Sequence, residues 1–391
     1  MRLLVAVAAH YARGPDGAVY TQGIHRRSFW QRYLEVFDEV TVLARTGRRD
    51  DMDSTWVPAD GPNIEFRSLP DYAGPWEYLA LRSELKAVAR EAVADADAYL
   101  LRSGGNAVTA LAWSEIRRRR RPYAVEVTGD PWGILRPGSV KTCVRPIGRR
   151  IYTRNLRLQC RHASAIAYVT RATLQQHYPA ALGAFTTHYS TVDMPAEAYV
   201  DQPRRFHVPG RRLVYIGNLH HYIKGADVFV EAVASCLRRG VQVQAEMLGG
   251  GPRRAEFEQL IRSLGAGDHV RLLGQVTDRR DVIRRLDSAD LFVCPSRAEG
   301  LPQAMIEAMG RALPCIGTSV GGIPELLPSQ DMVPPRDARA LSSKIIEVAR
   351  DPERMTRMSA RNLEVASEYR AEVLVPRRRE FYQRLRALSG G

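Results

Sequence analysis

The stretch from residue 291 to residue 325 constrains the fold of this chain most, because it reads as a complete strand–helix–strand unit. Leu291 to Cys294 is apolar throughout, which is typical of a buried parallel strand. A short loop follows, and Pro302 suits the first turn of a helix. A second strand, Pro314 to Gly317, leads to the turn Gly321-Gly322. The two loops therefore lie at the carboxyl edge of a parallel sheet, where open α/β sheets bind ligands.

Two glutamates lie in this unit, Glu299 in the loop and Glu307 in the helix. A helical span of that length separates Cα atoms by about 12 Å. Paired carboxylates of hydrolases lie closer, at about 5–9.5 Å, so separate roles along one extended ligand are favoured. The helix start suits a phosphate, because it offers free N–H groups and a positive dipole end. Carboxylates on either side suit hydroxyls, which points to a sugar–diphosphate–nucleoside.

The residues from Glu299 to Glu325 read EGLPQAMIEAMGRALPCIGTSVGGIPE. This string resembles the paired glutamates and following Gly-Gly loop of glycosyltransferase family 4, which has the GT-B fold. The alternative is a buried strand–helix–strand with two solvated glutamates. The resemblance implies an α/β protein with two Rossmann-like domains facing across a cleft and a C-terminal helix returning to the first domain.

The order of strands and helices predicts where these domains lie. Alternating strand and helix patterns cover the first 200 residues and restart at Leu213, which favours two doubly wound α/β domains. A Pro- and Arg-rich segment, residues 201–212, reads as the linker. We expect an acceptor-binding domain at 1–205, a donor-binding domain at 206–370 and the returning helix at 371–391.

Several elements of the N-terminal half follow from hydrophobic patterns. Residues 3–9 predict the first strand, and residues 10–18 a loop at its carboxyl end. Residues 24–37 and 76–93 each predict one helix. Residues 45–63 are polar and predict a loop or a hairpin insertion.

The resemblance also implies roles for residues of the second domain. The loop from Gly217 to Gly225 resembles the family's glycine-rich loop, in which Lys224 would hold the donor diphosphate. Asn218 stands where the family often has an arginine. Glu299 would bind hydroxyls of the donor sugar, and Glu307 those of the ribose. Lys224 and Glu299 are the expected catalytic residues.

Further residues are expected to bind the donor through the backbone or through polar side chains. Gly300, Leu301 and Gln303 would present backbone N–H groups to the sugar and diphosphate. Gln275 lies where the family holds the nucleotide base. Gly17 follows the first strand and allows the backbone to approach a ligand closely.

Acceptor contacts are expected in the first half of the chain. Family members often carry a histidine after the strand that here ends at Thr128, but Gly129 and Asp130 follow in this chain. His10, Thr128 and Asp130 are the candidates for contact with the acceptor or the sugar. The alternative for Asp130 is capping of the next turn.

The net charge of +14 indicates an anionic partner, such as nucleic acid, a membrane surface or a phosphorylated substrate, or else a generally arginine-rich composition. Basic and apolar residues alternate over residues 140–162, as in segments that lie on anionic membranes. A plain surface helix is the alternative. The five arginines at 117–121 read as a solvated helix end, and no nucleic acid is expected as a partner.

No metal site is expected. Asp95-Ala-Asp97 resembles the D-x-D metal motif of the other large glycosyltransferase fold, but it precedes the strand predicted at Ala98–Arg102 instead of following it. No cofactor is expected either, since the nucleotide-diphosphate sugar is a substrate, with UDP or GDP as the expected nucleotide. The five cysteines are scattered, which fits a reducing cytosol. The expected location is the cytoplasm, peripheral at the cytoplasmic face of the plasma membrane if residues 140–162 bind it.

Together these features predict a retaining, metal-independent glycosyltransferase. The expected acceptor is a saccharide or a glycolipid, in polysaccharide synthesis. A soluble natural product of the antibiotic type is the alternative acceptor. A nucleotide-sugar epimerase or a phosphorylase of the same fold is the alternative enzyme, and a basic nucleic-acid-binding protein is the alternative outside enzymes.

Overall fold

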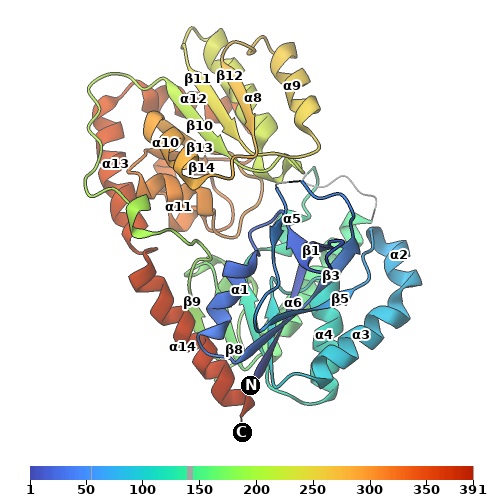
Figure 1. Ribbon diagram of the computed structural model, residues 1–391. Helices are drawn as coiled ribbons and strands as arrows, with labels where there is room; N and C mark the ends of the chain where they lie inside the picture. The colour runs from blue at the N-terminus through green and yellow to red at the C-terminus, as the bar shows by residue number, and fades with distance from the viewer. Residues whose placement is uncertain (54, 139–143, 391) are drawn as a thin grey trace. The chain divides into compact units, whose positions relative to one another are not determined.

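The computed structural model describes residues 1–53, 55–138 and 144–390. The chain packs into two compact units (Figure 1). The first unit contains residues 1–128, 150–189 and 375–391, and the second contains residues 129–149 and 190–374. Each unit is an α/β unit built on its own sheet.

The first unit is organised around a sheet that has nine strands within its described residues. Seven of them run parallel in the order β5-β3-β1-β6-β7-β8-β9, whereas β2 pairs antiparallel with β1 and β4 pairs antiparallel with β2. The strands are β1 (Arg2–Arg13), β2 (Val19–Thr21), β3 (Glu39–Arg48), β4 (Val57–Pro58), β5 (Ile64–Leu69), β6 (Ala98–Arg102), β7 (Ala124–Val127), β8 (Ala165–Tyr168) and β9 (Phe185–His188).

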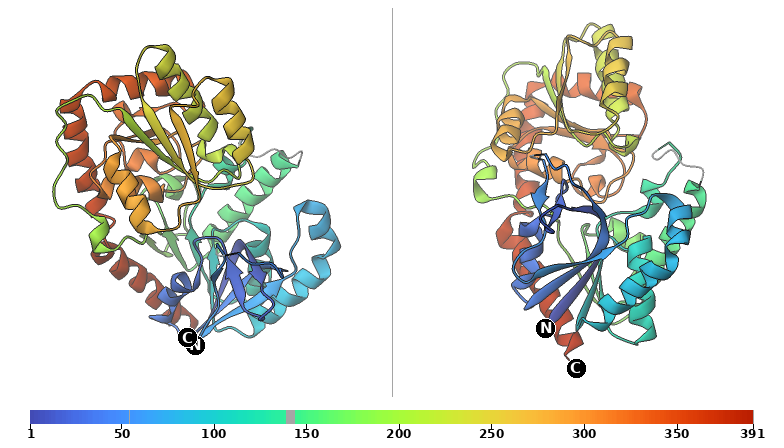
Figure 2. Two further views of the ribbon diagram at one scale, coloured as in Figure 1. Left: turned by 45° about the horizontal axis from the view of Figure 1, so that its top comes forward. Right: turned by 45° about the vertical axis from the view of Figure 1, so that its right-hand side comes forward.

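Helices cover both faces of this sheet. Helices α1 and α14 lie on one face, and α3, α4 and α6 lie on the other (Figures 1 and 2). The helices that contribute to this unit are α1 (Arg27–Leu34), α2 (Gly74–Ala80), α3 (Arg82–Ala94), α4 (Ala107–Arg118), α6 (Arg145–His162), α7 (Thr173–His177) and α14 (Ala371–Ser389). The last helix belongs to the first unit from Val375 onward, as the resemblance implies.

The second unit has a fully parallel sheet, with six strands among the described residues, in the order β12-β11-β10-β13-β14-β15. In chain order this is 3-2-1-4-5-6, the order of doubly wound nucleotide-binding sheets. The strands are β10 (Arg212–Ile216), β11 (Gln244–Leu248), β12 (Val270–Gly274), β13 (Leu291–Cys294), β14 (Cys315–Thr318) and β15 (Met332–Val333). The order in which strands are added reverses between β10 and β13, because β11 and β12 follow on one side of β10 and β13 lies on its other side. β10 and β13 pair at Leu213–Leu291 and Val214–Phe292.

Two helical layers enclose the second sheet. Helices α8, α9 and α12 lie on one face, and α10, α11 and α13 lie on the other (Figure 1). The helices are α5 (Pro131–Ile134), α8 (Ala226–Arg238), α9 (Arg254–Ser263), α10 (Arg279–Ser288), α11 (Gln303–Gly310), α12 (Ala338–Ala349) and α13 (Pro352–Ser367). This unit also contains the short 3₁₀ helices η1 (Ala196–Ala198), η2 (Tyr222–Lys224), η3 (Ile323–Glu325) and η4 (Ser329–Asp331).

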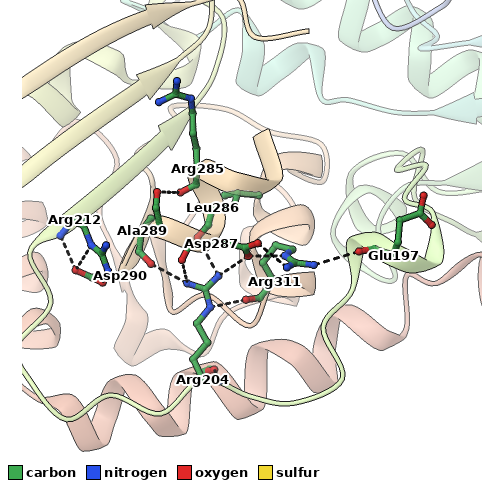
Figure 3. Close-up of polar contacts among 11 residues, drawn as sticks. Glu197, Arg204, Arg212, Arg285, Leu286, Asp287, Ala289, Asp290 and Arg311 are labelled. Atoms are coloured by element: carbon green, nitrogen blue, oxygen red, sulfur yellow. Dashed lines mark hydrogen bonds and ion pairs between the residues drawn. The ribbon is translucent and has the colours of Figure 1, made fainter. Parts of the chain in front are cut away.

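Arg204 fixes the segment that leads into the second unit. Its guanidinium donates to the carbonyl oxygens of Leu286 and Ala289 at the end of α10, at 3.1 and 2.9 Å. It also donates to the carbonyl of Arg311 after α11, at 2.8 Å (Figure 3). Carbonyl groups at helix ends lack partners within the helix, and a cation there is favoured by the helix dipole. One side chain therefore caps two helices of this unit.

Three local predictions for the first unit were wrong. β1 continues to Arg13 and turns back into β2, whereas residues 10–18 were expected to be a loop. The extension forms because Tyr11 and Ala12 are buried and Ala12 and Arg13 pair with β2. The single helix expected at 76–93 is interrupted at Leu81, between α2 and α3. β3 also extends four residues past Ala44, into the predicted loop at 45–63.

Candidate functional site

The candidate site of the second unit lies at the point in its sheet where the strand order reverses, between β10 and β13. β10 leads into the loop that ends at Lys224, and β13 leads into the loop that carries Glu299. These two strands are neighbours at the reversal. Loops from the carboxyl ends of two such strands diverge, which leaves room for a ligand between them.

Lys224 and Glu299 form an ion pair across this point. The Nζ atom of Lys224 lies 2.7 and 2.8 Å from the two carboxylate oxygens of Glu299. Ser296 also donates its hydroxyl to Glu299, at 2.6 Å. Glu299 is buried, whereas 31% of the Lys224 side chain is exposed. An ammonium has three N–H donors, so one donor of Lys224 is left for a ligand.

Lys224 is held in its charged form. Burial lowers the pKa of its ammonium, but the charge and the hydrogen bonds of Glu299 outweigh burial and raise the pKa above 10.5. The Lys224 ammonium therefore stays protonated throughout the physiological pH range.

Glycines let the loops of the site pack backbone against backbone. Gly225 has φ +70°, and a Cβ there would lie 2.0 Å from the carbonyl oxygen of Pro295. Gly321 has φ +53°, and its Cβ would lie 2.1 Å from the carbonyl oxygen of Glu299. Gly322 then donates its N–H to the carbonyl of Gly300 at 2.6 Å. These contacts fix the positions of Lys224 and Glu299.

The glycine-rich loop after β10 packs in the same way against the loop after β11. A Cβ on Gly249 would lie 2.0 Å from the carbonyl oxygen of Gly217. Gly250 receives the N–H of Leu219 at 2.8 Å and donates its own N–H to the Gln275 side chain at 3.3 Å. Asn218 and Gln275 are exposed at this edge. The structure thus brings Asn218, Lys224 and Gln275 to one edge of one sheet.

Helix α11 begins beside Glu299. Pro302 is the residue before the helix rather than its first residue, and no side chain caps the helix. Among the described residues, no acceptor receives the backbone N–H groups of Gly300, Leu301 or Gln303. The Gln303 side chain donates to the Thr191 hydroxyl at 2.5 Å. Free N–H groups at a helix start form a ready anion site.

Glu307 lies within α11 and is partly buried. Burial raises the pKa of its carboxyl above 4.5, while the nearby Arg279 acts in the opposite direction. No hydrogen bond to its carboxylate is present within the part of the chain that the structure describes. A partly buried carboxylate of this kind is suited to accept hydrogen bonds from paired hydroxyls.

The remaining predicted residues of the first half occupy different environments. His10 Nδ1 lies 3.0 Å from Asp71 Oδ1, and the hydroxyls of Thr128 and Ser103 are 2.5 Å apart. Gly17 occupies the turn between β1 and β2 with φ +80°. His10, Gly17 and Thr128 belong to the first unit, and Lys224 belongs to the second.

Asp130 belongs to the second unit and caps α5. Its carboxylate accepts the N–H groups of Trp132 and Gly133, both at 2.9 Å. This is the capping role that was the alternative to ligand contact. The two roles are compatible, since a carboxylate offers about four acceptor positions.

Residues that the sequence analysis missed hold the site together. Ser296 holds Glu299, and Arg297 forms an ion pair with Asp227 of α8 while its backbone N–H donates to the Ile223 carbonyl at 2.7 Å. Arg279 lies near Glu307. Ser296 and Arg297 shortly precede Glu299 in the same loop, and this proximity in sequence was the available signal. Arg279 had no such signal.

The arrangement combines a cation, free N–H groups and two carboxylates, which suits an anion flanked by hydroxyls. Residues 1–53, 55–138 and 144–390 contain no group of three or more His, Cys, Asp or Glu side chains arranged to hold a metal ion.

Comparison with known proteins gives consistent matches. Residues 210–351 match the family described as Glycosyl transferases group 1. Protein CapJ of Staphylococcus aureus is 22% identical over 324 residues, which cover 81% of this chain and 78% of CapJ. The putative colanic acid biosynthesis glycosyltransferase WcaL of Salmonella typhimurium is 33% identical over 136 residues, which cover 32% of this chain and 33% of WcaL.

Two solved structures have the same fold over the whole chain. Sucrose-phosphate synthase of Thermosynechococcus elongatus has a TM-score of 0.72 at 17% identity and covers 99% of each chain. HepE of Anabaena, solved in complex with UDP and glucose, has a TM-score of 0.65 at 16% identity and covers 100% of each chain. These neighbours are GT-B proteins, so the fold class predicted from the sequence is confirmed.

Proposed function

We propose that this chain is a glycosyltransferase that uses a nucleotide sugar, and that it transfers the sugar with retention of anomeric configuration and without a metal ion. The match of residues 210–351 to the Glycosyl transferases group 1 family supports this proposal. The observation that carries the proposal is the Lys224–Glu299 pair beside the free N–H groups of Gly300, Leu301 and Gln303. This combination fits a diphosphate with a sugar attached.

The proposed roles follow from charge and position. Lys224 and the start of α11 stabilise the diphosphate as negative charge develops on it, a contribution that is usually large in such sites. Glu299 accepts hydrogen bonds from the donor sugar, and Glu307 accepts them from the ribose. Asn218 and Gln275 contact the phosphates and the base from the neighbouring loops. No step needs a protein nucleophile.

We propose UDP as the nucleotide and a growing saccharide or glycolipid as the acceptor. The UDP bound to HepE and the polysaccharide named for WcaL support these choices. His10, Thr128 and Asp130 are the proposed acceptor contacts, and Gly17 remains a proposed donor contact. The acceptor class assigns the reaction to the cytoplasmic face of a membrane.

A thermal-shift screen tests the donor site. UDP-, GDP-, ADP- and dTDP-sugars are compared in EDTA, with the wild type, Glu307→Ala and the control Glu353→Ala. Glu353 is an exposed glutamate of α13. A ligand at 100 times its Kd stabilises by about 2.7 kcal/mol, and we expect this only for UDP-sugars, in the wild type and the control.

Failure of every nucleotide to shift a folded protein would remove the donor-site assignment. A shift that requires Mg²⁺ or Mn²⁺ would contradict metal independence. Once an acceptor is found, proton NMR of the product reports the anomeric configuration, and an inverted product would refute retention.

A further inference from the structure

Helix α6 carries a second apolar row that does not face the core. Its buried side chains are Thr153, Leu156, Gln159 and Cys160. Ile147 and Ile151, one turn apart, are 63% and 49% exposed. Leu158 continues this row two turns further along the helix and is partly exposed.

A row of arginines runs beside these apolar residues. This row contains three exposed arginines, Arg150, Arg154 and Arg161. They are four and then seven residues apart, which is the spacing of the apolar row. Many arginines of this chain are paired with carboxylates, but no carboxylate pairs with these three in the part of the chain that the structure describes. The outer face of α6 is therefore both apolar and positively charged.

Helix α2 adds exposed apolar side chains close to α6. Trp76 is 79% exposed and Leu79 is 53% exposed. Tyr78 of α2 lies close enough to Tyr152 of α6 for the two hydroxyl groups to influence each other electrostatically. Helix α2 and residues 150–162 of α6 lie on one side of the first unit (Figure 2). The acidic residue of α2, Glu77, accepts the N–H of Ala73 at 2.7 Å and so is turned toward the helix start.

We propose that the outer face of α6, together with Trp76 and Leu79 of α2, docks this protein on an anionic lipid bilayer. Isolated exposed apolar residues are ordinary on protein surfaces, but four large ones beside unpaired arginines fit the headgroup region. There the apolar atoms enter the acyl boundary and the guanidinium groups stay at the phosphates.

The proposal deepens the proposed function, because it supplies the surface on which a lipid-linked acceptor would be met. It does not depend on a spanning segment: across the described ranges, no helix has the length and apolarity needed to cross a bilayer. The residues involved are different from those of the donor site, so the two proposals can fail separately.

Vesicle sedimentation tests the docking surface. Phosphatidylcholine vesicles are compared with vesicles that contain 30 mol% phosphatidylglycerol, at about 0.05 and 0.15 M salt. Arg150→Gln with Arg154→Gln removes two charges from α6, and Arg119→Gln with Arg120→Gln removes two from the arginine run after α4. Ile151→Ser with Trp76→Ser removes apolar contacts, and Leu182→Ser removes an exposed leucine elsewhere.

We expect binding to the anionic vesicles only, weakened roughly thirtyfold by the α6 arginine variant. The apolar variant should also bind at least tenfold more weakly, and both controls should bind as the wild type does. Far-ultraviolet circular dichroism and the thermal midpoint verify the fold of each variant.

Three outcomes would overturn the proposal. One is absence of binding to anionic vesicles, and another is an equal loss in the α4 control. The third is a loss with the arginine variant but none with the apolar variant, which would indicate a purely electrostatic partner such as nucleic acid. Docking without any UDP-sugar shift would instead refute only the proposed donor chemistry.

Discussion

Lys224 is the cation of the proposed donor site, and its removal is the most direct test at the scale of single residues. In Lys224→Ala, buried Glu299 loses its cation and the diphosphate loses its electrostatic partner. We expect kcat/KM for the UDP-sugar to fall by about 10²–10³-fold. Lys86→Ala, at an exposed position of α3, is the matched control. Wild-type kinetics in Lys224→Ala would exclude Lys224 from catalysis.

The pH dependence of this pair follows from the raised pKa of Lys224. A cation whose pKa rises on folding stabilises the fold fully below its unfolded value of 10.5, and this stabilisation is lost as the pH rises through the folded pKa. The loss of Lys224 charge therefore falls above pH 10.5. Between pH 7 and 9 the protonation state of Lys224 does not change, so it should cause no change in activity or stability over this range.

The charged Glu307 carboxylate should lower the stability of the ligand-free protein and strengthen the binding of the UDP-sugar. Its pKa is raised by burial, so its favourable contribution is present below pH 4.5 and is lost as the pH rises through the folded pKa. At pH 7 the charged carboxylate therefore costs stability. Glu307→Gln should raise the thermal midpoint of the ligand-free protein and weaken UDP-sugar binding by about 10- to 100-fold. Calorimetry measures both quantities, and a lower midpoint would contradict the assigned burial cost.

At the scale of elements, the turn after β14 controls the loop that carries Glu299. Gly321→Ala puts a methyl group 2.1 Å from the Glu299 carbonyl oxygen at φ +53°, so the loop must move. Gly240→Ala is the matched control, because Gly240 has φ +74° and nothing within 4 Å of the added atom. Both changes carry the strain of a positive φ, about 1 kcal/mol.

Only Gly321→Ala should also displace Glu299, and we expect kcat/KM to fall by about a hundredfold. Unfolding in urea together with steady-state kinetics separates the two effects. An equal loss of activity in both variants would mean that strain, and not the position of the loop, accounts for the defect.

At the scale of the whole molecule, Glu126 holds the beginning and the end of the first unit together. This buried carboxylate on β7 pairs with Arg102 of β6. It accepts hydroxyl hydrogen bonds from Tyr189 at 2.5 Å, from Tyr33 of α1 at 3.1 Å and from Tyr382 of α14 at 3.3 Å. Glu126→Gln leaves Arg102 buried without its counter-charge and should cost about 3–5 kcal/mol. Urea unfolding measures this cost.

The acid stability of this cluster has a definite direction. Burial alone raises the pKa of Glu126, but Arg102 and the hydrogen bond from Tyr189 outweigh it and hold the pKa below 4.5. The contribution of Glu126 is therefore present above pH 4.5 and is lost as the pH falls through its folded pKa. Tyr382→Phe should cost only about 1–2 kcal/mol, because it removes one hydrogen bond and leaves the charges paired.

The sequence predicted the parts of this protein that depend on local patterns. Apolar runs such as Leu291–Cys294 gave the strands of the second unit, and the segment around Lys224 and Glu299 gave the candidate site. Contacts between distant residues could not be predicted. The burial of Glu126 depends on hydroxyls that come from both ends of the chain, and the Lys224–Glu299 pair spans 75 residues. The break at Leu81, between α2 and α3, is not indicated by the periodicity of residues 76–93.

The glycine contacts around Lys224 and Glu299 have a consequence for engineering. Gly225, Gly249 and Gly321 set the shape of the site through main-chain contact, while Asn218 and Gln275 stand exposed on the framework that they create. A combinatorial library at Asn218 and Gln275 should therefore consist mostly of folded members, whereas one at the three glycines should not. Altered donor preference is best sought by randomising the two side chains and keeping the glycines constant.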